Sequence, residues 1–180
     1  MTRGRRAAVI VAGVLLLFAG VALLAWRAAD DGTSADAAGA GRSSVVIEDP
    51  GPATAPFTGN TEGTITVGGA AVHVVVADGE PERVAGLRGR DDAAPYDGML
   101  FVFDADTTVA FTMAGVPAPL EIGFYAADGT PVDRLRMDPC QGTDATCPVY
   151  ESSGAFRYAL ETTPGAFPRG RLRVDVTPPS

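Results

Sequence analysis

Twenty consecutive residues, Ala7 to Trp26, carry no charged side chain, and this segment limits the fold of the chain more than any other. As a helix rising about 1.5 Å per residue, it would be roughly 30 Å long, which is the thickness of a bilayer core. Three arginines lie among residues 1–6, whereas one arginine and two aspartates follow at residues 27–31. Because the more positive flank stays in the cytoplasm, we expect a cytoplasmic stub at residues 1–6, a transmembrane anchor at residues 7–26, and all later residues outside the cytoplasm.

A cleaved signal peptide is the alternative reading of the same segment. The apolar region of a signal peptide usually has about 7–15 residues and is followed by a small-residue cleavage site. This run is longer, although "ADAAGA" at residues 35–40 offers such a site. Both readings place the C-terminal domain outside the cytoplasm, in a single-pass membrane protein or, after cleavage, in a secreted one.

The chain is acidic, with a formal net charge of −8. From Val46 onward it has 19 Asp and Glu against 9 Arg, so this part is near −10. Such a charge repels phosphate groups, and we therefore expect no nucleic-acid partner. It also disfavours docking on an anionic membrane surface, which leaves the N-terminal helix as the contact with the membrane.

Residues 27–63 are rich in small and polar residues and have little periodicity, which predicts a flexible linker. Some 35 flexible residues would span about 30–35 Å. The one apolar patch, "VVIEDP" at residues 45–50, leaves open a short additional strand.

Residues 64–177 have the texture of a mainly β domain. "TITVGGAAVHVVVA" at residues 64–77 alternates and breaks at Gly68-Gly69, which predicts a hairpin. "DGEPERVAGLRGR" at residues 78–90 predicts one short helix, with Pro81 in its first turn. Further strands are expected at residues 99–103, 109–113, 120–126, 132–137, 156–161 and 172–176. Many short strands with one small helix favour a compact antiparallel sandwich or a distorted barrel.

Five phrases in this domain resemble a known family when taken in order. They are "PERVAGLRGR", "YDGMLFVF", "LEIGFYAADG", "MDPC" and "RYALE", between residues 81 and 161. Over residues 64–176 the chain resembles the prokaryotic family catalogued as domain of unknown function 192. The resemblance implies one small mainly β domain, often exported behind a signal or an anchor, and it implies no established activity.

The sequence departs from this family at one segment. The stretch that commonly resembles F-W-M-K-N-T is FTMAGV here, residues 111–116, so the Trp, Lys and Asn are replaced by Thr112, Ala114 and Gly115. If that segment lines a pocket in the family, the pocket is altered in this chain. An acidic position that is usually Asp is Glu121, and the segment before the last strand shrinks to "TTPGAFPRG".

Cys140 and Cys147 are the two cysteines of the chain. Their spacing is not the C-x-x-C of thioredoxin-like sites, and with no second pair and no nearby histidine they make a poor zinc site. Because thiols oxidise outside the cytoplasm, we expect a structural disulfide that contributes roughly 2.5 kcal/mol, with metal or redox use as the alternative. We expect no metal and no cofactor in this domain.

The leading functional hypothesis is a non-catalytic, membrane-tethered domain that binds a small molecule, a glycan or an envelope protein. We expect its pocket to use aromatic and polar side chains. The candidates are Arg90, Phe111, Glu121, Phe124 and Tyr158.

Two other hypotheses stay open at this point. A carboxylate-dependent hydrolase would pair Glu121 with Glu161 as acid and base at about 5–9 Å. A less favoured copper-binding protein would combine thioethers with His73, the single histidine of the chain. The methionines concerned are Met99, Met113 and Met137.

Overall fold

The computed structural model describes residues 42–177, which are mainly β with one short helix. The stub, the expected membrane anchor and residues 27–41 of the expected linker lie outside the described residues. The elements are β1 (Arg42–Val45), β2 (Glu48–Pro52), β3 (Thr61–Val67), β4 (Ala70–Ala77), α1 (Glu80–Ala85), β5 (Gly98–Thr107), β6 (Phe111–Thr112), β7 (Leu120–Tyr125), β8 (Pro131–Met137), β9 (Val149–Tyr150), β10 (Phe156–Thr162) and β11 (Val174–Thr177).

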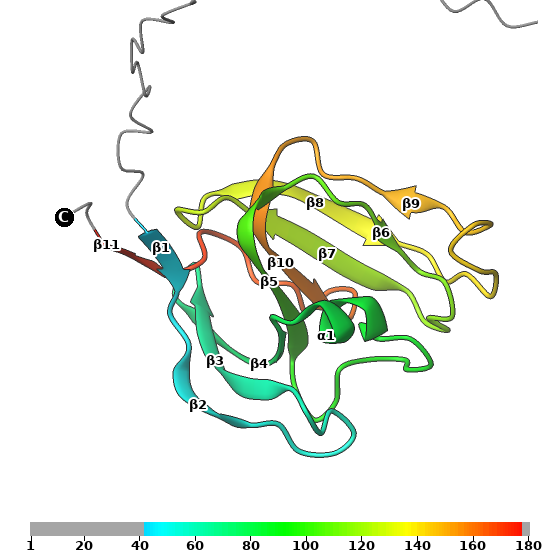
Figure 1. The fold of residues 1–180 in the computed structure, drawn as a ribbon, viewed down its shortest axis with the longest axis horizontal. Coiled ribbons are helices and arrows are strands. Elements are labelled where there is room, and N and C mark those ends of the chain that lie inside the picture. Colours follow the sequence, from blue (N-terminus) through cyan, green and yellow to red (C-terminus); the bar gives the residue numbers. More distant parts are fainter. Residues whose placement is uncertain (1–41, 178–180) are drawn as a thin grey trace, which may run out of the picture. The chain divides into compact units, whose positions relative to one another are not determined.

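Seven strands form the main sheet, in the order β2-β3-β4-β5-β10-β7-β8 (Figure 1). Neighbouring strands are antiparallel except β4 and β5, which are parallel because α1 and the chain after it cross over one face of the sheet before β5 begins. Within residues 42–177 the sheet stays open, with β2 and β8 at its edges. The mainly β fold with one short helix is confirmed, and most strand pairs are antiparallel as expected, but β4 and β5 are parallel and residues 42–177 form no closed barrel.

The predicted hairpin forms β3 and β4. Gly68 and Gly69 have φ values of 56° and 87°, as a two-residue hairpin turn requires, and Ile65 faces Val72 across the pair. β4 is followed directly by α1, whose first turn contains Pro81 as expected.

Ordered structure begins before the expected domain boundary at residue 64. β1 pairs with β11 and β2 pairs with β3, so residues 42–63, placed in the linker by composition, contain two strands and the start of a third. The physical reason is the apolar patch at residues 45–50, since Val45 and Ile47 pack against buried side chains of the sheet.

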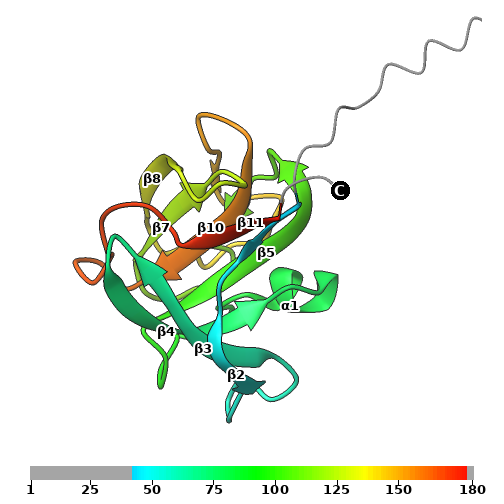
Figure 2. The same cartoon turned by 90° about the vertical axis from the view of Figure 1, so that its left-hand side faces the viewer.

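The sheet carries a hydrophobic core on each face because its side chains alternate. The helix-side core lies with α1 and the β6–β9 pair and includes Met99, Phe101, Ile122 and Phe124. The ribbon-side core, on the other face, is covered by the β1–β11 ribbon and the segment before β11 (Figure 2). It includes Ile65, Leu100, Tyr125, Tyr158 and Leu160.

No helix within residues 42–177 is long and apolar enough to cross a membrane. The expected strand at residues 109–113 is shorter in the structure, where only β6 remains and pairs with β9. This small pair joins the segment 111–116 to the end of the cysteine loop.

Candidate ligand-binding groove

A groove with a volume of about 400 Å³ opens on the helix-side face of the sheet. One wall is α1 with the turn that follows it, and the other is the segment from residue 109 to 116. Side chains of β5 line it between these walls, and the cysteine loop and β9 reach its rim. The apolar lining is made of Val84, Leu87, Phe101, Phe103, Val109, Phe111, Val116 and Val149.

Three valines at this groove are unusually exposed. Val84, Val109 and Val149 leave 64%, 45% and 58% of their surface open, and they are the large hydrophobic residues that the described part of the chain exposes. All three line the groove, although they come from α1, the β5–β6 connection and β9. Apolar surface gathered at one hollow in this way is typical of a binding site.

Aromatic rings support the groove from the core. The Phe111 ring lies edge-on to Phe101 and Phe124, with ring centroids 5.1 and 5.7 Å apart. Phe124 in turn contacts Phe156 at 4.8 Å. Because these rings are interlocked on rigid strands, the shape of the groove is fixed by the core.

Glu161 is an acidic residue in the groove whose neighbours on the sheet are apolar. It lies on β10 between Met99 of β5 and Ile122 of β7, and it lines the groove while only 5% exposed. Burial raises the pKa of this carboxyl to about 8. At neutral pH the group is therefore mostly protonated.

Two arginines line the groove, and the side chain of each donates hydrogen bonds to groups of the protein. Arg83 donates to the backbone carbonyl of Val102 at 2.9 Å and to that of Asp78, and its guanidinium lies 5.1 Å from the Phe103 ring centre. Arg88 donates to the carbonyl of Ala114 and forms an ion pair with Asp144 at 2.6 Å. These contacts hold α1 to β5 and to the opposite wall.

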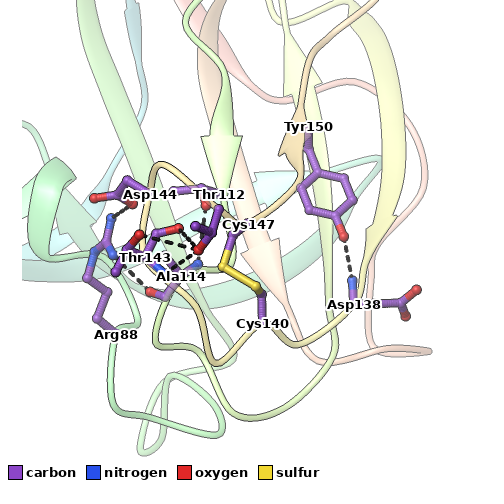
Figure 3. Close-up of a disulfide and its surroundings, with 10 residues drawn as sticks. Arg88, Thr112, Ala114, Asp138, Cys140, Thr143, Asp144, Cys147 and Tyr150 are labelled. Atoms are coloured by element: carbon purple, nitrogen blue, oxygen red, sulfur yellow. Dashed lines mark hydrogen bonds and ion pairs between the residues drawn. A yellow bond between two sulfur atoms is a disulfide. The ribbon is translucent and has the colours of Figure 1, made fainter.

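The predicted disulfide is confirmed (Figure 3), and the loop that it closes reaches the groove at Asp144. Cys140 and Cys147 are bonded with their Cα atoms 5.9 Å apart. The loop between them folds on itself, since Thr143 accepts hydrogen bonds from the backbone of Thr146 and Cys147. The backbone N–H of Gly115 donates to the carbonyl of Cys140, so the stapled loop fixes the segment that carries Phe111 and Thr112.

The five candidate pocket residues lie in different places. Phe111 lines the groove, and Phe124 is buried directly beneath it. Arg90 lies over the Phe57 ring at 4.6 Å, beyond α1. Glu121 pairs with Arg134 at 2.5 Å, and Tyr158 is buried in the ribbon-side core. The structure therefore brings two of the five together at the groove.

The suggested carboxylate pair is not formed. Glu161 lies opposite Ile122, whereas Glu121 lies opposite Thr162, so successive side chains place the two carboxyl groups on opposite faces of the sheet. Glu121 is an ion-paired surface acid: the hydrogen bond from Arg134 lowers its pKa. The hydrolase hypothesis built on this pair is wrong.

His73 and the three methionines also separate. Met99, Met113 and Met137 are buried in the helix-side core. His73 is exposed on β4, where its ring lies 4.9 Å from that of Tyr96 and its backbone N–H donates to the Asp97 carboxylate. Within residues 42–177 no cluster of three or more His, Cys, Asp or Glu side chains could hold a metal ion.

Sequence reasoning missed Val84, Val109, Val149 and the role of Glu161. A valine in a short helix reads as a core residue, and no local pattern shows that it faces a groove. The signal for Glu161 was present but weak: it is an acid that ends a run of buried residues, "RYALE".

Comparisons with known proteins agree with this fold. No curated protein matches the chain. A protein of unknown function from Novosphingobium aromaticivorans matches with a TM-score of 0.54 and 21% identity, over 69% of this chain and 92% of that chain. A putative transcription regulator from Sinorhizobium meliloti matches with a TM-score of 0.49 and 24% identity, over 63% and 90% of the two chains. The similarity to the Novosphingobium protein shows the fold, and the match covers most of that chain.

The family assignment rests on the match of a family model to most of the described domain. That model covers residues 63–177, from β3 to β11, and therefore includes both walls of the groove, the disulfide and Glu161. The chain belongs to the family described as "Uncharacterized ACR", the domain of unknown function 192.

Proposed function

We propose that this protein is a non-catalytic binding module, tethered to the outer side of the membrane by residues 7–26, and that it holds a small, mostly apolar molecule in the groove. The observation that carries this proposal is the gathering of the exposed valines Val84, Val109 and Val149 at one preformed hollow. The uncharged N-terminal segment and its arginines support the tether.

The size and lining of the groove favour a small molecule over a protein or a glycan. Its volume of about 400 Å³ lies in the usual range for small-molecule sites. A glycan would need many hydrogen-bonding groups, whereas this lining is chiefly valine and phenylalanine. A protein partner would need a contact area of about 800 Å² on this side alone, far beyond one small hollow.

A binding role also fits the chemistry of the groove. Its acids and bases are Glu80, Arg83, Arg88, Asp144 and Glu161, and it contains no serine, cysteine or histidine. Arg83 and Arg88 are held by backbone carbonyls and an ion pair. The Thr112 hydroxyl accepts a hydrogen bond from the backbone N–H of Ala114, and none of the hydrogen bonds within residues 42–177 joins it to a base.

The proposal is tested by filling the groove. Thr112 lines it and stands where the resembling family has Trp, so Thr112→Trp should reduce the space available. The matched control is Thr108→Trp, an exposed position outside the lining. The probe is an acylated dimethylaminonaphthalene ketone, a neutral dye whose emission shifts to the blue in apolar surroundings.

We expect the dye to bind wild type and Thr108→Trp alike, and to bind Thr112→Trp at least tenfold more weakly. The protein for this titration is a fragment from residue 37 to the C-terminus, and the same titration on the whole chain in nanodiscs, corrected for the dye that protein-free nanodiscs take up, should give the same affinity. Equal binding by both Trp variants would reject the groove as the site. Weaker binding by the whole chain would mean that residues 1–36 occupy the groove and exclude the dye. This result would also overturn the proposal.

The tether has its own test. Alkaline phosphatase fused after the last residue should be active in cells, because it folds only outside the cytoplasm, and the intact mass of the membrane-bound chain should include residues 1–26. An inactive fusion, or a mass that lacks this segment, would reject the tether without affecting the groove.

A further inference from the structure

We infer that the groove selects neutral apolar molecules that carry a carbonyl oxygen, such as ketones, esters, amides or quinones, and that Glu161 donates a hydrogen bond to that oxygen. The inference rests on the proposed function, because it names the ligand class of the same groove. It is carried by the placement of one carboxyl group in the groove, between the apolar side chains of Met99 and Ile122 on the flanking strands.

The position of Glu161 on the sheet aims its side chain at the groove. Residues directly opposite one another in a sheet share a face, so Glu161 lies on the same face as Met99 and Ile122. Phe101 and Phe103 follow Met99 at every second position of β5, so their side chains lie on the same face. Both line the groove. Glu161 is only 5% exposed and lines the groove, so its carboxyl group is reached through the groove.

No described residue satisfies this carboxyl group. Of the charged groups at the groove, α1 contributes Glu80 and Arg83, the turn after it contributes Arg88, and the cysteine loop contributes Asp144. On the flanking strands the facing residues are apolar. Arg83 donates to the Val102 and Asp78 carbonyls, and Arg88 donates to Asp144 and Ala114, so neither neutralises Glu161.

Protonated at neutral pH, the carboxyl group offers one O–H donor. The hydrogen bonds of the described residues give this donor no acceptor, and a ligand in the groove can supply one. A carbonyl oxygen supplies an acceptor without charge. A protonated amine would require ionised Glu161, which its burial opposes, and a carboxylate would bring an additional charge into an apolar hollow.

The experiment compares two dyes and two variants of the fragment from residue 37. The dyes are the acylated dimethylaminonaphthalene ketone and the same ring system without the acyl group. Glu161→Gln keeps a donor but cannot ionise, whereas Glu161→Met has a similar length and no donor. Circular dichroism and thermal melting establish that each variant is folded.

At about pH 6 we expect Glu161→Gln to bind the ketone as wild type does. Glu161→Met should bind the ketone about tenfold more weakly, the equivalent of one hydrogen bond, and should bind the dye without the acyl group at least as well as wild type. Since only the protonated acid donates, wild-type affinity for the ketone should fall as the pH rises through about 8, whereas the affinity of Glu161→Gln should stay constant.

Two results would overturn this inference while leaving the groove as a binding site. One is an unchanged ketone affinity in Glu161→Met, and the other is a wild-type affinity that rises with pH. If neither dye binds the folded wild-type protein, the proposed function fails as well, so the two failures are distinguishable.

Discussion

Glu161 lies where an acidic side chain costs stability. It is on a central strand of a seven-stranded sheet, with a neighbour on each side and the helix-side core around it. A hydrophobic residue of the same length would pack there without losing hydration. A buried acid that is reached only through a groove is typical of a functional group. The rest of the fold offsets the stability that such a group costs.

The cost of Glu161 predicts a dependence of stability on pH. Its pKa is about 8 in the folded protein against an ordinary value of 4.5. Between these values the folded state binds the extra proton, so the free energy of unfolding falls as the pH rises and levels off above about 8. The loss between pH 4 and pH 7 should be on the order of 3 kcal/mol. Glu161→Gln should remove it, as measured by urea unfolding at several pH values.

Glu121→Gln is the control for this prediction. The Arg134 side chain lowers the pKa of Glu121, so this acid stabilises the fold above its unfolded pKa and loses that effect as the pH falls. Its removal should leave the slope between pH 5 and pH 8 unchanged. A Glu161→Gln protein that keeps the wild-type slope in this range would show that Glu161 ionises freely in the folded state.

At the scale of elements, the segment 111–116 and the cysteine loop act as one unit. β6 pairs with β9, and the backbone of Cys140 forms isolated β-bridges with that of Ala114 and Val116. One wall of the groove is therefore attached to the disulfide, and the opposite wall reaches the same loop through Arg88 and Asp144 (Figure 3). The disulfide therefore contributes to the shape of the groove.

Removing the disulfide should weaken both the fold and the groove. Cys140→Ala with Cys147→Ala should lower the free energy of unfolding by about 2–3 kcal/mol, because a short loop is no longer closed in the unfolded chain. It should also weaken binding of the ketone dye, because the wall that carries Phe111 is released. Urea unfolding and the dye titration measure the two effects.

Asp144→Asn provides the comparison for the disulfide. It breaks an ion pair whose side chains are 38% and 66% exposed, and such pairs contribute less than about 1 kcal/mol. Reductant should destabilise wild type and Asp144→Asn equally and leave the double alanine variant unaffected. A double variant as stable as wild type would contradict the structural role of the disulfide.

The elements that the sequence predicted well are those set by neighbouring residues. The Gly68-Gly69 turn fixes the β3–β4 hairpin, and Pro81 begins α1. Pairings between distant segments carry no such local signal: β10 lies between β5 and β7, and β4 lies parallel to β5. The parallel pair could have been inferred, because a helix between two strands is typical of a crossover connection.

At the scale of the whole molecule, the groove could not be predicted for a related reason. Its walls come from α1, β5, the segment after it, the cysteine loop and β10, which are far apart in the chain. Phe111 could be predicted as a groove residue because it is aromatic and begins the segment 111–116, which departs from the family pattern. Tyr158 is also aromatic but lies on the other face of the sheet, because the side chains of β10 alternate from Tyr158 to Glu161.

The start of the domain offers the last prediction. The family model begins at residue 63, yet Val45 and Ile47 pack into the ribbon-side core and β1 pairs with β11. A fragment from residue 48 should therefore be less stable than one from residue 37 by about 2 kcal/mol, the value of two partly buried aliphatic side chains. A fragment from residue 63 should lose more, because it also lacks Phe57, which is 5% exposed in the helix-side core.

Dye binding separates stability from function in this series. The first truncation removes cover from the face opposite the groove, so under folding conditions the fragment from residue 48 should bind the ketone dye with unchanged affinity. Urea unfolding and the dye titration on all three fragments give the two readouts. Equal stability of the fragments from residues 37 and 48 would place the boundary after β1, and weaker dye binding by the fragment from residue 48 would mean that the two faces of the sheet are coupled.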